Sequence, residues 1–143
     1  MTARLARARG VLFSMVFLGA LLLVTGCRRG VRCATCGMKI DQASPWVSYI
    51  VVGGKEEVFD TPSCAFTAWR KGAARVNEAR FREYYSQELK AVEELRFVTG
   101  SDVVGPMGPD LVPVAAGTAA RFARDHNGAP PRTADEIVRG ETP

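Results

Sequence analysis

The stretch Trp46-Val47-Ser48-Tyr49-Ile50-Val51-Val52-Gly53-Gly54 decides the fold of the first half of the chain. Its β-branched and aromatic side chains occupy both faces, as in a buried strand. The two glycines supply the positive φ angles of a tight hairpin, so residues 56–60 are predicted to return as the partner strand. Thr61-Pro62 then offers an N-cap followed by a proline at the first helical position. This order places Cys64 in the first turn of a helix.

A similar unit recurs further along the chain. Residues 96–100 and 111–115 are predicted strands, and Thr118 is predicted to cap a helix that ends near Asn127-Gly128. Setting Cys64-Ala65-Phe66 against Ala120-Arg121-Phe122 also aligns Gly72 with Gly128. The second copy lacks the cysteine.

Residues 78–95 carry apolar side chains at helical spacing, and Asn77 offers a cap. The local pattern therefore predicts one long helix. Near the C-terminus, Thr133-Ala134-Asp135-Glu136 matches a capping box and predicts a short final helix.

Residues 1–26 are interpreted as an export signal. Arginines precede the charge-free apolar run of residues 11–25, which is shorter than the roughly 20 residues of a spanning helix. Val24-Thr25-Gly26-Cys27 is similar to a bacterial lipobox, so Cys27 is expected to carry acyl chains as the mature N-terminus, with residues 27–32 as a tether. Several chains anchor a protein stably where one does not. An ordinary signal peptide or an uncleaved anchor is the alternative.

The net charge of the mature chain excludes one class of partner. Removing residues 1–26 takes away three of the 19 Lys+Arg and none of the 15 Asp+Glu, which leaves 16 against 15. Nucleic-acid binding needs a basic patch on the folded domain. No nucleic-acid partner is therefore expected, and residues 27–143 suffice for one domain.

The remaining sulfur-bearing side chains point to a soft metal ion. With Cys27 assigned to lipid, Cys33, Cys36 and Cys64 form an odd set in a compartment that oxidises thiols. Thiolates and thioethers favour Cu(I), and a turn at Gly37 could direct Cys36 and Met38 at one ion. A helix N-terminus should also favour the Cys64 thiolate.

Other interpretations of these residues stay open. Cys33 and Cys36 could form a disulfide, and Cys64 could be a small buried hydrophobic residue. Met107 lies in the turn-forming run Gly105-Pro106-Met107-Gly108-Pro109, but methionines are often core filler. His126 is interpreted as a dipole partner at the end of a helix rather than as a ligand.

The motifs together resemble the NosL family of copper-binding lipoproteins, which are associated with maturation of nitrous oxide reductase. The resemblance rests on Cys36-Gly37-Met38, on Phe59-Asp60 with Cys64 soon after, and on residues 97–101 leading into Pro106-Met107-Gly108. It continues through residues 119–128. The first half is also similar to YHS-type metal-binding modules.

The resemblance implies a compact α+β domain over residues 33–143, made of two related strand-strand-helix-strand units. It implies a Cu(I) site in which Cys36, Met38 and Met107 match the family motifs best, with Cys64 and Cys33 next. It further implies a membrane-anchored, non-enzymatic metallochaperone in the periplasm that delivers copper to a periplasmic enzyme, nitrous oxide reductase or a related client.

The chain departs from the family at Phe81-Arg82-Glu83-Tyr84-Tyr85, where a strand ending in an aspartate and an aromatic residue is expected. Family likeness makes part of this segment a strand, against the helical periodicity. Two other functions compete with copper delivery: a thiol-disulfide oxidoreductase using Cys33 and Cys36, and a structural zinc module. Redox pairs of this spacing normally sit at a helix N-terminus, whereas Gly37-Met38 leads toward a strand.

Overall fold

The computed structural model describes residues 30–72 and 76–140. The predicted export signal, residues 1–26, and the predicted lipidation site Cys27 lie outside the described residues. Inside the two described ranges, no helix combines the length and the apolar character needed to cross a membrane.

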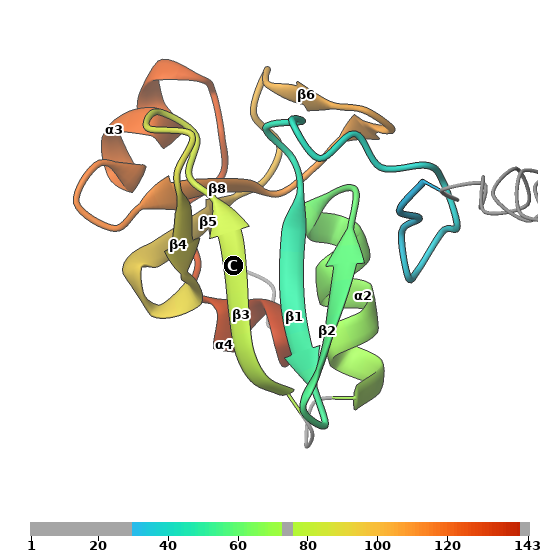
Figure 1. Cartoon of the computed structure of the whole chain (residues 1–143). Helices are drawn as coiled ribbons and strands as arrows, with labels where there is room; N and C mark the ends of the chain where they lie inside the picture. The colour runs from blue at the N-terminus through green and yellow to red at the C-terminus, as the bar shows by residue number, and fades with distance from the viewer. Residues whose placement is uncertain (1–29, 73–75, 141–143) are drawn as a thin grey trace, which may run out of the picture.

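The first half of the chain forms an antiparallel sheet of four strands and one helix (Figure 1). Gly53 and Gly54, with φ angles of 57° and 80°, make the predicted tight hairpin between the first two strands. The strand order is β2-β1-β3-β4, so the third strand lies beside the first. The elements are β1 (Ser48–Val52), β2 (Lys55–Phe59), α2 (Pro62–Gly72), β3 (Val76–Arg82) and β4 (Leu89–Ala91).

The long helix predicted from the periodicity of residues 78–95 is wrong, and the strand implied by the family resemblance is confirmed. β3 pairs with β1, with Ala79 opposite Ile50, and its period of two buries Ala79 and Phe81. The chain then turns at Gln87, whose φ angle is 59°. The helically spaced apolar residues thus belong to separate elements, because pairing with β1 and burial outweigh local propensity.

The second half repeats the order strand, strand, helix, strand in reduced form. β5 (Leu95–Val98) pairs antiparallel with β8 (Val112–Ala115), α3 (Ala119–Asp125) follows, and Arg132 then makes one antiparallel bridge to Phe97. In both halves the last strand pairs with the first. This shared topology confirms the predicted α+β fold of two related units.

Three short elements complete the domain: the 3-10 turn η3 (Val92–Glu94), the hairpin of β6 (Val104–Gly105) with β7 (Gly108–Pro109), and α4 (Ala134–Val138). The predicted capping box of α4 is present, since Thr133 Oγ1 accepts from Glu136 N and the Glu136 carboxylate accepts from Thr133 N. Thr118 precedes α3 as predicted. However, its hydroxyl donates to the Ala115 carbonyl instead of accepting from a helix amide.

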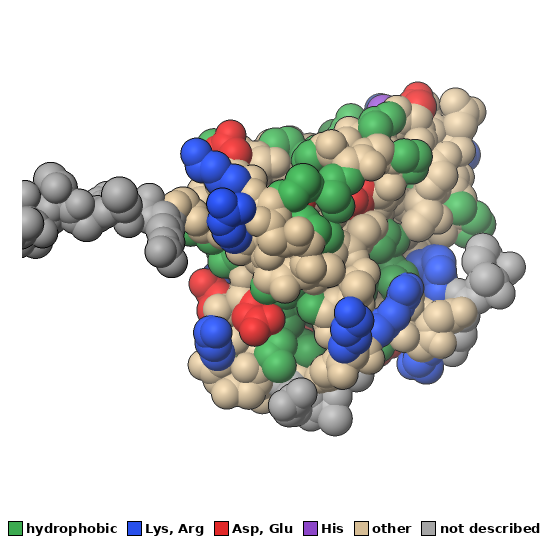
Figure 2. Space-filling view, turned by 90° about the vertical axis from the view of Figure 1, so that its right-hand side faces the viewer, with side chains coloured by type: hydrophobic (Ala, Val, Ile, Leu, Met, Phe, Trp, Pro, Cys, Tyr) green, Lys and Arg blue, Asp and Glu red, His purple; other side chains and the backbone are tan. Residues whose placement is uncertain are grey.

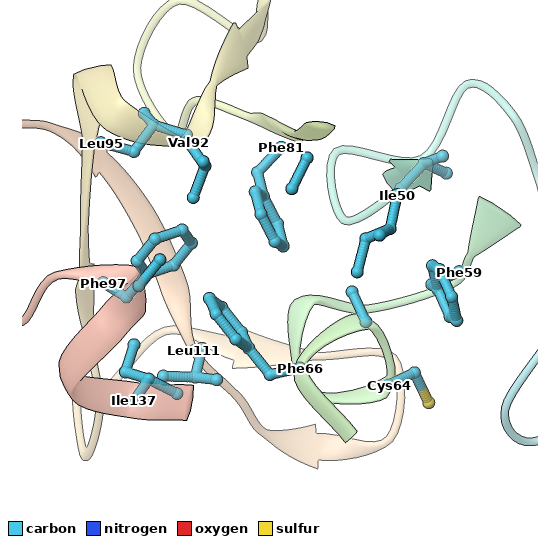
Figure 3. Close-up of a cluster of buried hydrophobic side chains, with 14 of the residues drawn as sticks. Ile50, Phe59, Cys64, Phe66, Phe81, Val92, Leu95, Phe97, Leu111 and Ile137 are labelled. Atoms are coloured by element: carbon cyan, nitrogen blue, oxygen red, sulfur yellow. The ribbon is translucent and has the colours of Figure 1, made fainter. Parts of the chain in front are cut away.

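Three phenylalanines join the two halves in one core (Figure 3). Phe66 of α2 stacks on Phe81 of β3 with 5.2 Å between ring centroids. Both rings meet Phe97 of β5 edge-on, at 4.8 and 4.9 Å. Figure 3 shows Cys64 at the border of this cluster, with its sulfur directed away from the aromatic centre. The core therefore fixes α2, and with it one end of the candidate site.

Candidate metal centre

A tight loop carries the first two cysteines. Cys33 N donates to Met38 O at 2.8 Å, and Gly37 N donates to Cys33 O at 3.0 Å. Gly37 adopts a φ of 76°, which favours glycine. An antiparallel bridge from Arg32 to Lys39 closes the loop, so Arg32, which the sequence assigns to the tether, joins the fold. The loop leads into an extended segment and not into a helix, as expected from Gly37-Met38.

The loop is fastened to both neighbouring elements. Ala34 N donates to Val58 O of β2 at 3.0 Å. Thr35 Oγ1 donates to Cys64 O of α2 at 2.8 Å. These bonds hold the loop against the junction between β2 and α2, which is where the third cysteine lies.

Helix α2 positions Cys64 in its first turn, as predicted. Thr61 Oγ1 accepts from Cys64 N at 3.3 Å, which satisfies one of the free amides at the helix start. The sequence thereby fixes both the start of the helix and the direction of its third residue.

Four donor side chains converge at this junction. The ligand atoms of Cys33, Cys36, Asp60 and Cys64 all lie within 4.8 Å of one another. The Cys36 thiol lies 3.5 and 3.6 Å from the two Asp60 carboxylate oxygens. Cys33, Cys64 and Asp60 are buried, whereas Cys36 is exposed, and all three cysteines are free thiols. Cys36 is therefore the side of the cluster that meets solvent.

The thiol pKa values differ from the expectation for a helix start. Burial raises the pKa of Cys64 well above its ordinary value, and the neighbouring Asp60 side chain and Cys33 raise it further. Partial desolvation also raises the pKa of Cys36, against the opposing effect of the Met38 backbone. In the metal-free protein these causes oppose the thiolate that the helix start is expected to favour at Cys64. A cation that binds here displaces thiol protons.

Asp60 is the member of the cluster that sequence reasoning missed. In the sequence it belongs to the family-like Phe59-Asp60 and is not an expected donor. One signal could have found it: an acidic residue ends a strand directly before the Thr61-Pro62 helix start, four residues from Cys64. At 7% exposure its carboxylate is buried beside the thiols.

The two candidate methionines are exposed side chains and not core filler. Met38 is 41% exposed and Met107 is 48% exposed. Met107 lies with Pro106 at the tip of the β6–β7 hairpin, between the paired residues Gly105 and Gly108. Figure 2 views the molecule from the side of the cysteine loop, where hydrophobic side chains gather in the middle of the face among charged ones.

A small pocket brings the methionine turns and the cysteine cluster together. It has a volume of about 160 Å³. Met38, Asp60 and Pro106 all line it, so the loop after Cys36, the cluster and the hairpin tip face one space. The remaining lining residues are Lys39, Ile40, Asp41, Ser44 and Val47. The ligand roles of the five sulfur-bearing residues stay predictions.

His126 lies beside Phe122 and Asp102 and not at the cysteines. Its ring stacks on Phe122 with 4.4 Å between centroids, and its Nδ1 lies 2.8 Å from Asp102 Oδ1. It is the C-cap residue of α3, in keeping with its interpretation as a residue at a helix end.

The donor set fits a soft or borderline cation. Three thiols and one carboxylate within reach of one another could hold a tetrahedral ion such as zinc. The thioether of Met38 on the adjoining pocket adds a donor of the kind that favours Cu(I). The partial burial of the cluster suits an ion held away from water but reachable through Cys36.

Comparisons with known proteins agree with this architecture. The structure is similar to the crystal structure of the copper chaperone NosL from Shewanella denitrificans, with a TM-score of 0.64 and 19% sequence identity over 77% of this chain and 91% of that one. No curated protein matches the sequence. The sequence model of the NosL family matches residues 26–140. The chain therefore belongs to the NosL family.

Proposed function

We propose that this protein is a lipid-anchored Cu(I) metallochaperone of the periplasm, with no catalytic role of its own. The observation that carries the proposal is the convergence of Cys33, Cys36, Cys64 and Asp60 within 4.8 Å, next to a pocket shared by Met38 and Pro106. Membership of the NosL family supports it, and the similar solved structure is that of a copper chaperone.

Copper is cargo in this proposal and not a resident cofactor. A chaperone must hold its ion firmly yet release it to another protein, which requires a ligand that a partner can replace. Cys36 is the exposed thiol of the cluster, while Cys33 and Cys64 are 3% and 5% exposed. A ligand of the partner could replace Cys36 first, while the two buried thiols hold the ion until the transfer is complete. This order fits the requirement.

The proposed client is a periplasmic copper enzyme, with nitrous oxide reductase as the first candidate because of the family resemblance. Deleting the gene should leave that enzyme poor in copper. Restoring the gene should recover the copper content, whereas restoring a Cys36→Ser variant should not. Metal analysis of the purified reductase measures the effect, and full copper content in the deletion strain would point to another client.

Metal competition tests the copper proposal directly. The reduced mature domain should bind one Cu(I) in anaerobic competition against a calibrated chelator, and it should hold Zn(II) far more weakly. Cys36→Ser and Cys64→Ser should both lose the copper. Submicromolar zinc affinity without copper retention would contradict the proposal.

The zinc module remains the second candidate because of Asp60. Three thiolates and one carboxylate make a closed tetrahedral set for zinc, whereas zinc would leave the methionines without a role. Met107→Leu separates the two functions, since it conserves volume at under about 1.5 kcal/mol while removing a thioether. It should leave the melting temperature of the apo domain unchanged and weaken Cu(I) binding. Normal copper binding by Met107→Leu would restrict the site to the four-residue cluster.

A further inference from the structure

The β6–β7 hairpin that carries Met107 depends on contacts outside itself for its position. Within the described residues its two strands pair with each other and with no strand of the four-stranded sheet or of the β5-β8 sheet. In Figure 1 it extends from the second half of the domain toward the chain segment before β1, and Pro106 at its tip faces Met38 and Asp60 across the pocket. A thioether at such a tip can join the cysteine centre only if the hairpin is held in place.

Asp110, directly after β7, supplies that fixation. Its Oδ1 accepts three hydrogen bonds: from Ser63 N at 2.9 Å, from Ser63 Oγ at 2.7 Å and from Leu111 N at 2.7 Å. Ser63 is the second residue of α2 and precedes Cys64. Asp110 is buried, with 8% of the residue exposed, and a carboxylate at a helix start both satisfies free amides and complements the helix dipole. The base of the hairpin is thus bound one residue away from a thiol of the centre.

Gly105 lets the hairpin lie close to this carboxylate. A Cβ atom added at Gly105 would lie 3.2 Å from Asp110 Cβ and 3.4 Å from Gly108 O. The distance to Asp110 Cβ is tighter than ordinary van der Waals contact, and the distance to Gly108 O is at its lower limit, so a side chain at this position requires a small displacement of Asp110 or of the hairpin.

We propose that Asp110 is a positioning residue that holds the hairpin tip carrying Met107 beside the pocket of the cysteine centre by binding the N-terminus of α2. The inference rests on the proposed Cu(I) function. It adds that the hydrogen bonds between Asp110 and Ser63 couple the methionine hairpin to the cysteine cluster. Asp110 itself donates nothing to the ion. Its effect is transmitted through Met107, and this distinguishes it from a residue that only stabilises the fold.

A double-mutant cycle tests the coupling in the full-length protein. Asp110→Asn weakens acceptance from Ser63 and should lower Cu(I) affinity about tenfold to a hundredfold, the range for residues that orient metal ligands. In a Met107→Leu background the same substitution should leave the affinity unchanged, because the ligand that it positions is already gone. Asp102→Asn is the matched control: this exposed carboxylate before the hairpin bonds His126 and not α2, and its loss should leave copper binding intact.

Nuclear magnetic resonance of methyl-labelled methionine separates a positioning role from a purely structural one, because only a positioning role changes how the Met107 methyl signal responds to Cu(I). The Met107 methyl signal should shift on addition of Cu(I) in the wild type and stay in place in Asp110→Asn. If Asp110→Asn fails to fold, Gly105→Ala perturbs the same contact with the carboxylate intact, and it should reproduce both effects.

Two results overturn the inference. One is an equal loss of affinity in the wild-type and Met107→Leu backgrounds, and the other is a Met107 signal that still responds to copper in the Asp110→Asn or Gly105→Ala variant. Both leave the proposed function standing, since the wild type still binds copper. Failure of the wild type to bind Cu(I) instead removes the proposed function.

Discussion

Asp60 contributes the charge that distinguishes this centre from a set of thiols alone. Its carboxylate is buried within 3.6 Å of the Cys36 sulfur. A fixed acceptor at this distance both orients the Cys36 thiol and offers an oxygen to a cation. Asp60 lies in the two-residue junction between β2 and α2, so the strand and the helix on either side set its position.

Replacing Asp60 with asparagine should weaken metal binding by about tenfold to a hundredfold. The amide keeps the shape of the side chain and removes its charge. Asp41→Asn is a suitable control, because Asp41 lines the same pocket but is exposed and outside the four-residue cluster. Chelator competition on the two variants checks the prediction, and equal affinity in both would assign Asp60 a structural role.

The cysteines of the site could be predicted from the sequence, whereas Asp60 has only a weak local signal and Asp110 has none. Sulfur is rare, and its spacing in Cys33, Cys36 and Cys64 indicates soft-metal chemistry without a structure. Acidic residues are common on any surface. Burial and distant partners distinguish these two from the exposed carboxylates, and neither property is encoded locally.

At the scale of elements, the turn between β3 and β4 depends on a buried carboxylate. Burial alone would raise the pKa of Glu83, but hydrogen bonds from the backbone amides of Ser86 and Ala115 outweigh it and hold the pKa below the usual value of 4.5. The bonds measure 2.6 Å to Ser86 N and 3.2 Å to Ala115 N. Glu83 therefore ties the end of β3 to β8, and so the first unit to the second.

Glu83→Gln should lower the free energy of unfolding at neutral pH by about 2 kcal/mol, the scale of a hydrogen bond to a charged group. Because the folded pKa is lowered, the stabilisation is present above pH 4.5 and is lost as the pH falls through the folded value. Urea denaturation at pH 7 and below pH 4 should therefore show the difference shrinking in acid. Glu88→Gln, an exposed change in the same turn, is the control, and a gap that does not depend on pH would exclude this role.

The hairpins and capped helices were predictable, because their signals are local. Gly53-Gly54, Thr61-Pro62 and the Thr133 capping box each act through neighbours in sequence. The strand β3 could not be predicted from local pattern, because the apolar residues of 78–95 are spaced as in a helix although β3 is extended. Its conformation follows from pairing with β1, a non-local contact, and only the family likeness indicated it.

At the scale of the whole molecule, the predicted membrane tether precedes a domain of two related units. Cys27→Ala should release the protein from membranes or block its processing, since several acyl chains on Cys27 would supply the anchor. Cell fractionation with mass measurement checks this. A Cys27→Ala protein that stays with membranes at wild-type mass would exclude lipidation at this residue. Cys36→Ser, which alters the metal centre alone, should fractionate as the wild type.

The connection between β5 and β8 also bears on how this domain could change over evolutionary time. Gly53 and Gly54 join β1 to β2 in the first unit, whereas residues 99–111 join the equivalent strands of the second and include the methionine hairpin. A surface loop of this kind can lengthen, shorten or exchange residues at little thermodynamic penalty. Under the proposed function, selectivity among cargo ions can therefore diverge through changes in one loop, while the thiols remain tied to the core of the other unit.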